Sequence, residues 1–185
     1  LDVAAHEMTH GVISHSANLV YRNQSGALNE SFADVFGVLV DDGDWEMGED
    51  IMAPAAKAEG VTVLRSLSNP NSVIVSNEQR REYSTNGGVY PDHMDEFYHM
   101  PTSVDGGGVH VNSSITNHAA FLIGQELGRE KLGKIYYRAL TVYLTANSNF
   151  SDARNAIVQS AIDLYGEGSE EETAAQSGFD AVGIY

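Results

Sequence analysis

The sequence predicts a single domain of the mainly α class with a long irregular section in its middle. Apolar residues recur at intervals of three and four along several segments, which is the spacing of one helix face. Segments that alternate apolar and polar residues, as strands do, are few, and there is no internal repeat. With 185 residues, of which 42% are hydrophobic, the chain can bury one substantial core.

Two helices are predicted at the start, joined as an antiparallel hairpin. Residues 2–17 are rich in small and apolar residues, and YRNQSG (21–26) has the composition of a polar turn. Residues 27–40 carry a helical apolar stripe, formed by Leu28, Phe32, Val35, Phe36 and Leu39. The first helix starts at once, with neither a capping residue nor a leader, which predicts that the chain was cut from a longer protein.

The middle of the chain is predicted to be irregular. DDGDWEMGED (41–50) holds six acids in ten positions and cannot lie in a core. Residues 52–109 contain the turn signals SNPNS, STNGG, YP and VDGGG.

Four more helices are predicted in the last part of the chain. A helix over 112–127 can be capped by Asn112 or Ser113, and residues 129–144 have apolar positions at helical spacing. The next helix starts at a Ser151 cap and stops at Gly166, and residues 169–183 form a last short helix.

Composition excludes several classes of function. The formal net charge is -16, from 26 acids and 10 bases, so nucleic acid would be repelled. Such acidity suits a secreted protein or one that binds divalent cations. The absence of cysteine excludes disulfides, thiolate zinc sites and cysteine nucleophiles. No apolar run is long enough to span a bilayer, and no signal peptide precedes Leu1.

The stretch AHEMTHG (5–11) is the strongest local motif. On a helix, His6 and His10 lie on one face and can turn a ring nitrogen toward the same cation. Glu7 lies close enough to act on a water there without binding the metal itself. This is the HExxH pattern of zinc peptidases, and its alternative is a helix that carries two surface histidines.

A catalytic zinc needs a third protein ligand and one open position. Glu30 follows His10 by twenty residues, and Asp34 lies one turn further along the same helix face. The hairpin would bring Glu30 beside the two histidines. A metzincin is excluded because Ile13 and Ser16 stand where its glycine and third histidine would be.

Motifs along the whole chain resemble those of the thermolysin-like neutral metalloproteases, in family order. They are HEMTHG, YRNQSGALNESFADVFG, DWEMGED, LRSLSNP, YPDHM, GGGVHVNSSITNHAAFLI, KLGKIYYRAL and SAIDLYG. The resemblance implies that residues 1–185 are one domain, the helical C-terminal catalytic lobe of a two-lobed zinc metalloprotease, with the strand-rich N-terminal lobe absent. Glutamate-zincin aminopeptidases, the alternative, place the glutamate one residue closer and lack the GGVH block.

The resemblance also implies a role for each residue of the catalytic site. Zinc would be held by His6, His10 and Glu30, with Asp34 and Asn29 supporting the two histidines. Glu7 would be the general base. The residues around the oxyanion would be His110 and Tyr21 as hydrogen-bond donors and Asp105 as the carboxylate that orients His110.

Further residues match the substrate and calcium sites of the family. Arg65 would bind a substrate carbonyl, and cleavage before a bulky hydrophobic residue is expected from apolar pocket walls at Val3, Met47, Ile51 and Leu64. Calcium would be bound by the side chains of Asp2, Asp41, Asp44 and Glu49 and the backbone carbonyl of Glu46. The loop between Asp41 and Asp44 is shorter than in well-known members, so one calcium ion is expected rather than two. The alternative is a plain acidic loop.

Two departures from the family affect the expected activity. SVIVSNEQRREYSTNGGV (72–89) is extra material with a basic pair, expected to be a surface excursion near the cleft. The missing lobe would supply the other wall of the cleft, so the 185 residues alone are expected to turn over peptides poorly. The implied partners are peptide substrates, that lobe and a pro-segment, in a secreted protein. The competing hypotheses are a non-catalytic metal-binding module and an autolytic fragment.

Overall fold

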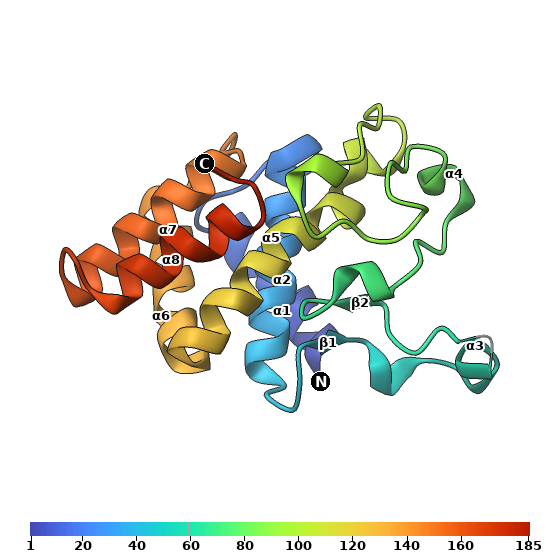
Figure 1. Ribbon diagram of the computed structural model, residues 1–185, viewed down its shortest axis with the longest axis horizontal. Coiled ribbons are helices and arrows are strands. Elements are labelled where there is room, and N and C mark those ends of the chain that lie inside the picture. Colours follow the sequence, from blue (N-terminus) through green and yellow to red (C-terminus); the bar gives the residue numbers. More distant parts are fainter. Residues whose placement is uncertain (59) are drawn as a thin grey trace.

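A pair of central helices organises the molecule. The computed structural model describes residues 1–58 and 60–185 (Figure 1). Helix α2 (Asn23–Val40) packs against both α1 (Asp2–Ser14) and the long helix α5 (Asp105–Leu127). Because α2 has neighbours on both sides, it is buried along most of its length. The predicted pairing of the first two helices is present, and the mainly α class is confirmed.

The C-terminal helices cover one end of this centre, in orange and red in Figure 1. They are α6 (Arg129–Arg138), the π-helical turn Ala139–Tyr143, α7 (Phe150–Tyr165) and α8 (Glu170–Ala181). Helix α8 lies on both α5 and α7. The main apolar core lies between these helices and α2, and its largest fully buried side chains include Phe32, Ile123, Tyr136, Phe150 and Phe179.

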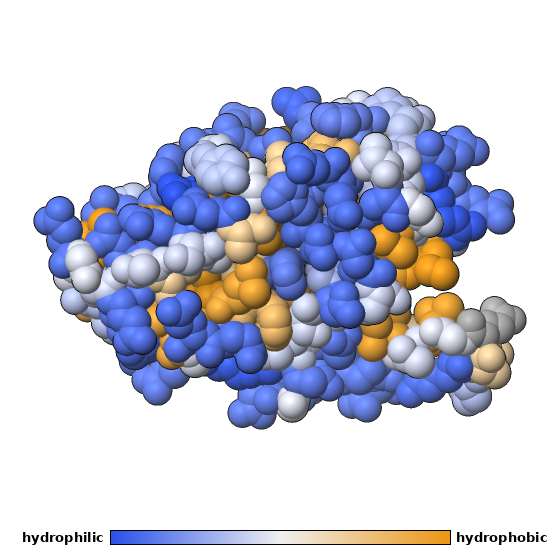
Figure 2. All heavy atoms as spheres, in the orientation of Figure 1, coloured by the Kyte–Doolittle hydropathy of each residue, from blue (hydrophilic) through white to orange (hydrophobic). Residues whose placement is uncertain are grey.

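The middle of the chain is irregular, as predicted, and forms the opposite end of the molecule. Its only strands among the described residues, β1 (Glu46–Met47) and β2 (Arg65–Ser66), pair antiparallel. Short helical pieces connect the loops: Glu49–Ile51, α3 (Pro54–Ala58), Pro70–Ser72, α4 (Glu78–Arg81) and Met94–Glu96. Figure 2 shows apolar side chains beside a notch on this side of a largely hydrophilic face. A hollow in this section is lined by residues 60–63 and 72–74 together with Glu46.

Most of the extra segment 72–89 lies at the surface, and the segment is anchored at Val75. Val75 is fully buried in a second apolar cluster with Tyr90, Tyr98, Met100, Val104 and Val111, which lies at the start of α5. The Tyr98 hydroxyl donates to the carbonyl of Val89, and Ile74 pairs with Val89 across an isolated bridge. The segment is therefore fixed to the residues that precede α5 in the chain.

The first four residues of α5, 105–108, form a left-handed turn rather than regular helix. The φ angles of Asp105, Gly106, Gly107 and Gly108 are +51°, +59°, +92° and +85°. Glycine adopts this region freely, whereas a side chain at position 107 would meet Asn23 Oδ1 at 2.2 Å. The regular helix therefore begins after Gly108, and the predicted caps Asn112 and Ser113 are wrong.

The side chain of Asn112 binds the backbone of Tyr98 instead of capping a helix. Its buried amide bonds the backbone N–H and C=O of Tyr98. Two further helices also start at positions that differ from the prediction. Helix α2 begins at Asn23, inside the predicted turn. Helix α7 is capped by Asn149, which exchanges hydrogen bonds with Asp152, rather than by Ser151. Among the described residues, no helix is both long and apolar enough to cross a membrane.

Candidate active site

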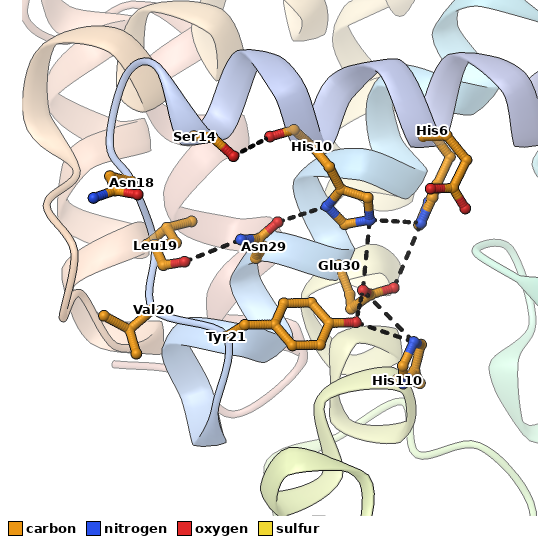
Figure 3. A pocket seen from close by; sticks show the side chains of 11 residues that line it. His6, His10, Ser14, Asn18, Leu19, Val20, Tyr21, Asn29, Glu30 and His110 are labelled. Carbon is orange, nitrogen blue, oxygen red and sulfur yellow. Dashed lines mark hydrogen bonds and ion pairs between the residues drawn. The ribbon is translucent and has the colours of Figure 1, made fainter.

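His6 and His10 of α1 converge on Glu30 of α2 (Figure 3). The two Nε2 atoms lie 3.0 Å apart, because residues four positions apart share a helix face. Glu30 places one oxygen 3.6 Å from His6 Nε2 and the other 3.6 Å from His10 Nε2. The structure thus brings together the three residues predicted as metal ligands, with one donor atom of each within 4.8 Å of the others.

The opposite ring nitrogens are held by acceptors on α2. His6 Nδ1 lies 2.8 Å from Asp34 Oδ1, and His10 Nδ1 lies 2.7 Å from Asn29 Oδ1. The amide of Asn29 also donates to the carbonyl of Leu19, which fixes its oxygen toward His10. Each Nδ1 therefore carries the hydrogen, and the Nε2 lone pairs point into the space between the rings and Glu30.

Asp34 is the buried centre of a charged network. It accepts two hydrogen bonds from Arg65, at 2.6 and 2.8 Å, and one from the amide of Asn117 at 2.9 Å. Burial alone would raise the pKa of Asp34, but Arg65 and His6 outweigh it and hold this pKa well below its usual range. Burial alone would lower the pKa of His6, and Asp34 outweighs it, so the pKa of His6 is raised. Two Arg65 donors are thus committed to Asp34, and Asn117 is a partner that the sequence did not reveal.

The donor set fits a divalent cation. Glu30 is almost fully buried, and its Oε2 has no hydrogen-bond partner among the described residues. A buried carboxylate oxygen that faces two imidazole lone pairs is unfavourable without a positive charge between them. Two imidazoles and one carboxylate are a ligand set of catalytic zinc sites.

His110 and Tyr21 complete the other side of this space. His110 Nδ1 lies 2.6 Å from Asp105 Oδ1, and its backbone N–H donates to Oδ2 of the same carboxylate. The Tyr21 hydroxyl lies 3.1 Å from His110 Nε2 and donates to Glu30. Burial and this bond to Glu30 raise the pKa of Tyr21, which is therefore neutral and remains a donor.

The candidate metal ligands, Tyr21 and His110 line one cavity of about 580 Å³. Its lining includes His6, Glu7, His10, Tyr21, Glu30 and His110. Glu7 is solvent-exposed, beside the metal-binding group but outside it. The cavity therefore places a carboxylate base and two hydrogen-bonding groups around an open face of the candidate metal site.

A smaller hollow of about 160 Å³ adjoins this space. Three of the four predicted pocket residues line it, namely Val3, Met47 and Leu64, together with Arg65. Ile51 is not among its lining residues and is 60% exposed. The pairing of β1 with β2 explains the arrangement, because Met47 lies opposite Arg65 in the two-stranded sheet.

The acidic segment gathers a set of carboxylates that differs from the predicted one. Asp41, Glu49 and Asp50 each offer an oxygen within 4.8 Å of the others, and Asp50 was not predicted. Burial and the nearby Asp2 and Asp44 raise the pKa of Glu49. Its Oε2 is buried and has no described partner.

The other predicted calcium ligands contact different groups. Asp2 accepts a hydrogen bond from the N–H of Gly48, and Asp44 accepts one from the N–H of Glu46. The Glu46 carboxylate accepts from the hydroxyls of Ser66 and Ser68. Of the predicted side-chain ligands, Asp41 and Glu49 therefore lie in the group that the structure brings together, and Asp2 and Asp44 do not.

Comparison with known proteins identifies the family. The family model described as thermolysin metallopeptidase, alpha-helical domain, matches residues 17–184. The chain belongs to this family.

Relatives of this thermolysin metallopeptidase domain extend well beyond it. An extracellular elastase of Staphylococcus epidermidis is 48% identical over 183 residues, which are 99% of the chain and 32% of the relative. A bacillolysin of Bacillus caldolyticus is 43% identical over 200 aligned positions, covering the whole chain and 33% of the relative. The chain spans about a third of the length of these curated relatives.

A solved structure of the same kind supports the fold. It is described as the precursor of protealysin, a metalloproteinase from Serratia proteamaculans. The TM-score is 0.82 at 31% identity, and the match covers the whole chain and 57% of that structure. The predicted fold, the helical domain of a thermolysin-like protease, is confirmed.

Proposed function

We propose that this chain is the zinc-binding catalytic lobe of a secreted endopeptidase that cleaves peptide bonds with water. The observation that carries the proposal is the convergence of His6, His10 and Glu30 at one end of a cavity that Glu7, Tyr21 and His110 also line. A zinc ion held by these ligands supplies Lewis-acid polarisation of the peptide carbonyl and lowers the pKa of water. The remaining chemistry belongs to the side chains of this chain.

Glu7 is proposed to move the proton. It accepts a proton from the attacking water and delivers it to the nitrogen of the departing amine. Its place in both the large cavity and the small hollow supports this role, because a carboxylate there reaches either side of the scissile bond. A surface glutamate without such a task would not need to lie beside the metal-binding group.

Tyr21 and His110 are proposed to stabilise the oxyanion that forms when water attacks the carbonyl. Both carry a polar atom into the cavity, and Asp105 fixes the His110 ring through Nδ1. A donor placed where negative charge develops typically contributes about 2.7 to 4 kcal/mol to the barrier reduction.

The small hollow is proposed to receive the side chain that follows the scissile bond. Val3, Met47 and Leu64 give it apolar walls, which favour a bulky hydrophobic residue. Ile51 would contribute at most from the rim. Arg65 lines the same hollow, where a guanidinium N–H can donate to a substrate carbonyl.

At least one calcium ion is proposed at the acidic segment. The unpartnered buried oxygen of Glu49 beside Asp41 and Asp50 supports this assignment. Hard carboxylate oxygens suit calcium, and the same cluster without a cation is repulsive.

The complete protein is proposed to be extracellular and to contain a second lobe and a pro-segment. The extracellular elastase among the relatives supports the location, and the length of both relatives, about three times that of this chain, supports the further segments. Residues 1–185 alone are expected to cleave casein much more slowly than the complete protein, because the second lobe positions the substrate. Equal rates for the two would contradict that expectation.

The mechanism is tested by Glu7→Gln in the complete, zinc-loaded protein. We expect peptide hydrolysis to fall by about 10² to 10⁴ while zinc content is unchanged, because the amide cannot accept the proton. Glu126→Gln, at an exposed position of α5, is the matched control and should retain activity. If Glu7→Gln keeps both its zinc and its rate, the proposed mechanism fails, because Glu7 is then not the general base.

A further inference from the structure

We propose that Arg80, in the extra segment 72–89, is a positioning residue that holds the carboxylate of Asp105 and thereby fixes the ring of His110. The inference rests on the proposed function, in which His110 stabilises the oxyanion. It assigns a task to a segment that the catalytic mechanism does not otherwise use.

The contact lies behind the catalytic cavity. Arg80 Nη2 is 2.8 Å from Asp105 Oδ1, the same oxygen that lies 2.6 Å from His110 Nδ1. The other oxygen of Asp105 accepts the backbone N–H of His110 at 3.1 Å. Both oxygens are therefore fixed, and the carboxylate cannot rotate without breaking one of these contacts.

The burial of Asp105 explains why a cation is needed there. Its side chain is 1% exposed, whereas that of Arg80 is 26% exposed. A buried carboxylate is costly unless it is paired and hydrogen-bonded. Among the lysines and arginines that the structure describes, Arg80 alone approaches Asp105 within 4 Å.

The backbone conformation of Asp105 is a second reason why its side chain must be held by its neighbours. Asp105 has a φ of +51°, a region that costs a non-glycine residue roughly 1–3 kcal/mol, and it opens the left-handed turn at the start of α5. Such a conformation persists only when its surroundings enforce it. The ion pair with Arg80 and the two bonds to His110 are contacts that do so.

The segment 72–89 is built to deliver Arg80. Helix α4 is capped by the Asn77 side chain, which accepts the N–H of Arg80. Arg81 donates to the carbonyls of Val75 and Ser76, and Val75 is fully buried in the second apolar cluster. The guanidinium of Arg80 therefore extends from an anchored element rather than from a loose loop.

The test compares Arg80→Gln with Lys57→Gln in the complete, zinc-loaded protein. We expect Arg80→Gln to lower kcat about tenfold and to change KM less than about twofold. Tenfold is the lower limit of the loss usually seen when a residue that orients a functional side chain is replaced. The loss appears in kcat because an oxyanion donor acts in the transition state. Lys57→Gln removes an equal charge at an exposed position of α3, and Lys57 does not approach Asp105 within 4 Å, so this variant should leave both constants within about twofold.

A second comparison asks whether Arg80 acts through His110. In a His110→Ala background, Arg80→Gln should have no further effect, because the ring that it positions is gone. Arg80→Lys should recover part of kcat, since an ammonium restores the charge but not the fork geometry. Zinc content and thermal midpoint are measured for every variant.

Three results would overturn the proposal: an unchanged kcat in Arg80→Gln, an equal loss in Lys57→Gln, or a full further loss from Arg80→Gln in the His110→Ala background. The last would mean that Arg80 acts on another group. The proposed function fails separately, if Glu7→Gln and His110→Ala both retain the original rate.

Discussion

Asp34 has no access to substrate, yet its carboxylate joins His6 to Arg65 and Asn117. Because it is fully buried, each of these contacts is formed in a region where an unpaired charge is costly. Asp34 therefore contributes both to the basicity of His6, which we propose as a metal ligand, and to the stability of the fold around it.

We expect Asp34→Asn to weaken zinc binding about 10- to 100-fold, because the amide is a poorer acceptor for the imidazole N–H. The same change leaves the Arg65 guanidinium buried without its counter-ion, which costs about 3–5 kcal/mol of unfolding free energy. Competition with a chelator and urea unfolding of the metal-free protein measure the two effects. Asp95→Asn, at a solvent-exposed carboxylate, should change neither. An unchanged chelator midpoint for Asp34→Asn would show that His6 does not depend on it.

Sequence spacing identified the residues whose positions depend on one helix or on one hairpin. His6 and His10 meet because of the helical period, and Glu30 meets them because α1 and α2 pair. Asn117 and Arg80 could not be found in this way. They reach Asp34 and Asp105 from elements distant in the chain, and an ordinary asparagine or arginine carries no local signal of such a contact.

Among the elements, α8 and α5 approach closely because of one glycine. A Cβ at Gly178 would lie 2.5 Å from Ile123 Cγ1 and 3.1 Å from the carbonyl of Ala119. We expect Gly178→Ala to lower the free energy of unfolding by about 1–3 kcal/mol, because the helices must separate. Gly133→Ala, on α6, meets only Leu39 at an ordinary 3.4 Å, and it should be neutral or stabilise by up to about 1 kcal/mol. Denaturant midpoints that rank the two variants the other way would contradict this packing argument.

Hydrogen bonds between the π-helical turn and α7 make a pH-dependent contribution to the free energy of unfolding. Hydrogen bonds from Tyr143, Arg138 and Gln159 to Asp163 lower the pKa of that carboxyl to about 2. A depressed folded-state pKa adds stability that is complete above the unfolded value, about 3.9, and is lost as the pH falls toward 2. We therefore expect Asp163→Asn to be less stable than the wild type at pH 6, with the difference shrinking between pH 4 and pH 2.

This comparison is made by denaturant unfolding of the metal-free proteins, so that loss of metal at low pH does not contribute. Glu167→Gln, at an exposed position just beyond α7, is the control and should follow the wild type at every pH. A difference for Asp163→Asn that persists undiminished at pH 2 would contradict the pKa assignment.

The existence of the long helices could be predicted from their apolar period, but several of their starts could not. Helix α2 begins within a segment whose polar composition resembles a turn. The start of α5 depends on consecutive left-handed residues, and the run of glycines there predicts a turn but not its hand. Local composition cannot distinguish a loop from a polar first turn of a helix, because the packing that decides between them is tertiary.

At the scale of the whole molecule, the net charge of -16 opposes a compact state. Calcium at the acidic segment would reduce this repulsion where it is densest. We expect saturating calcium to raise the thermal midpoint by about 5 °C or more, relative to sodium chloride of equal ionic strength. Glu49→Gln should remove most of this gain, whereas Asp42→Asn, an exposed acid outside the cluster, should keep it. An equal response of both variants would place the ion elsewhere.

The general architecture followed from the sequence, because amphipathic helices have few ways to bury one continuous core. The second apolar cluster, in contrast, could not be predicted from the sequence. Its members Val75, Tyr90, Tyr98 and Val111 are spread over segments that have turn signals between them, with no period to connect them. The extra segment 72–89 contributes Val75 to this cluster, whose other buried members follow the segment in the chain.

The left-handed turn at Asp105–Gly108 has a consequence for how the gene can evolve. Each glycine codon is converted to a codon for a chiral residue, or to a stop codon, by any change at its first or second base. Three such codons, for residues 106–108, stand in succession, and only Val109 separates them from His110, which we assign to the oxyanion. This short stretch of the gene should therefore tolerate very little drift.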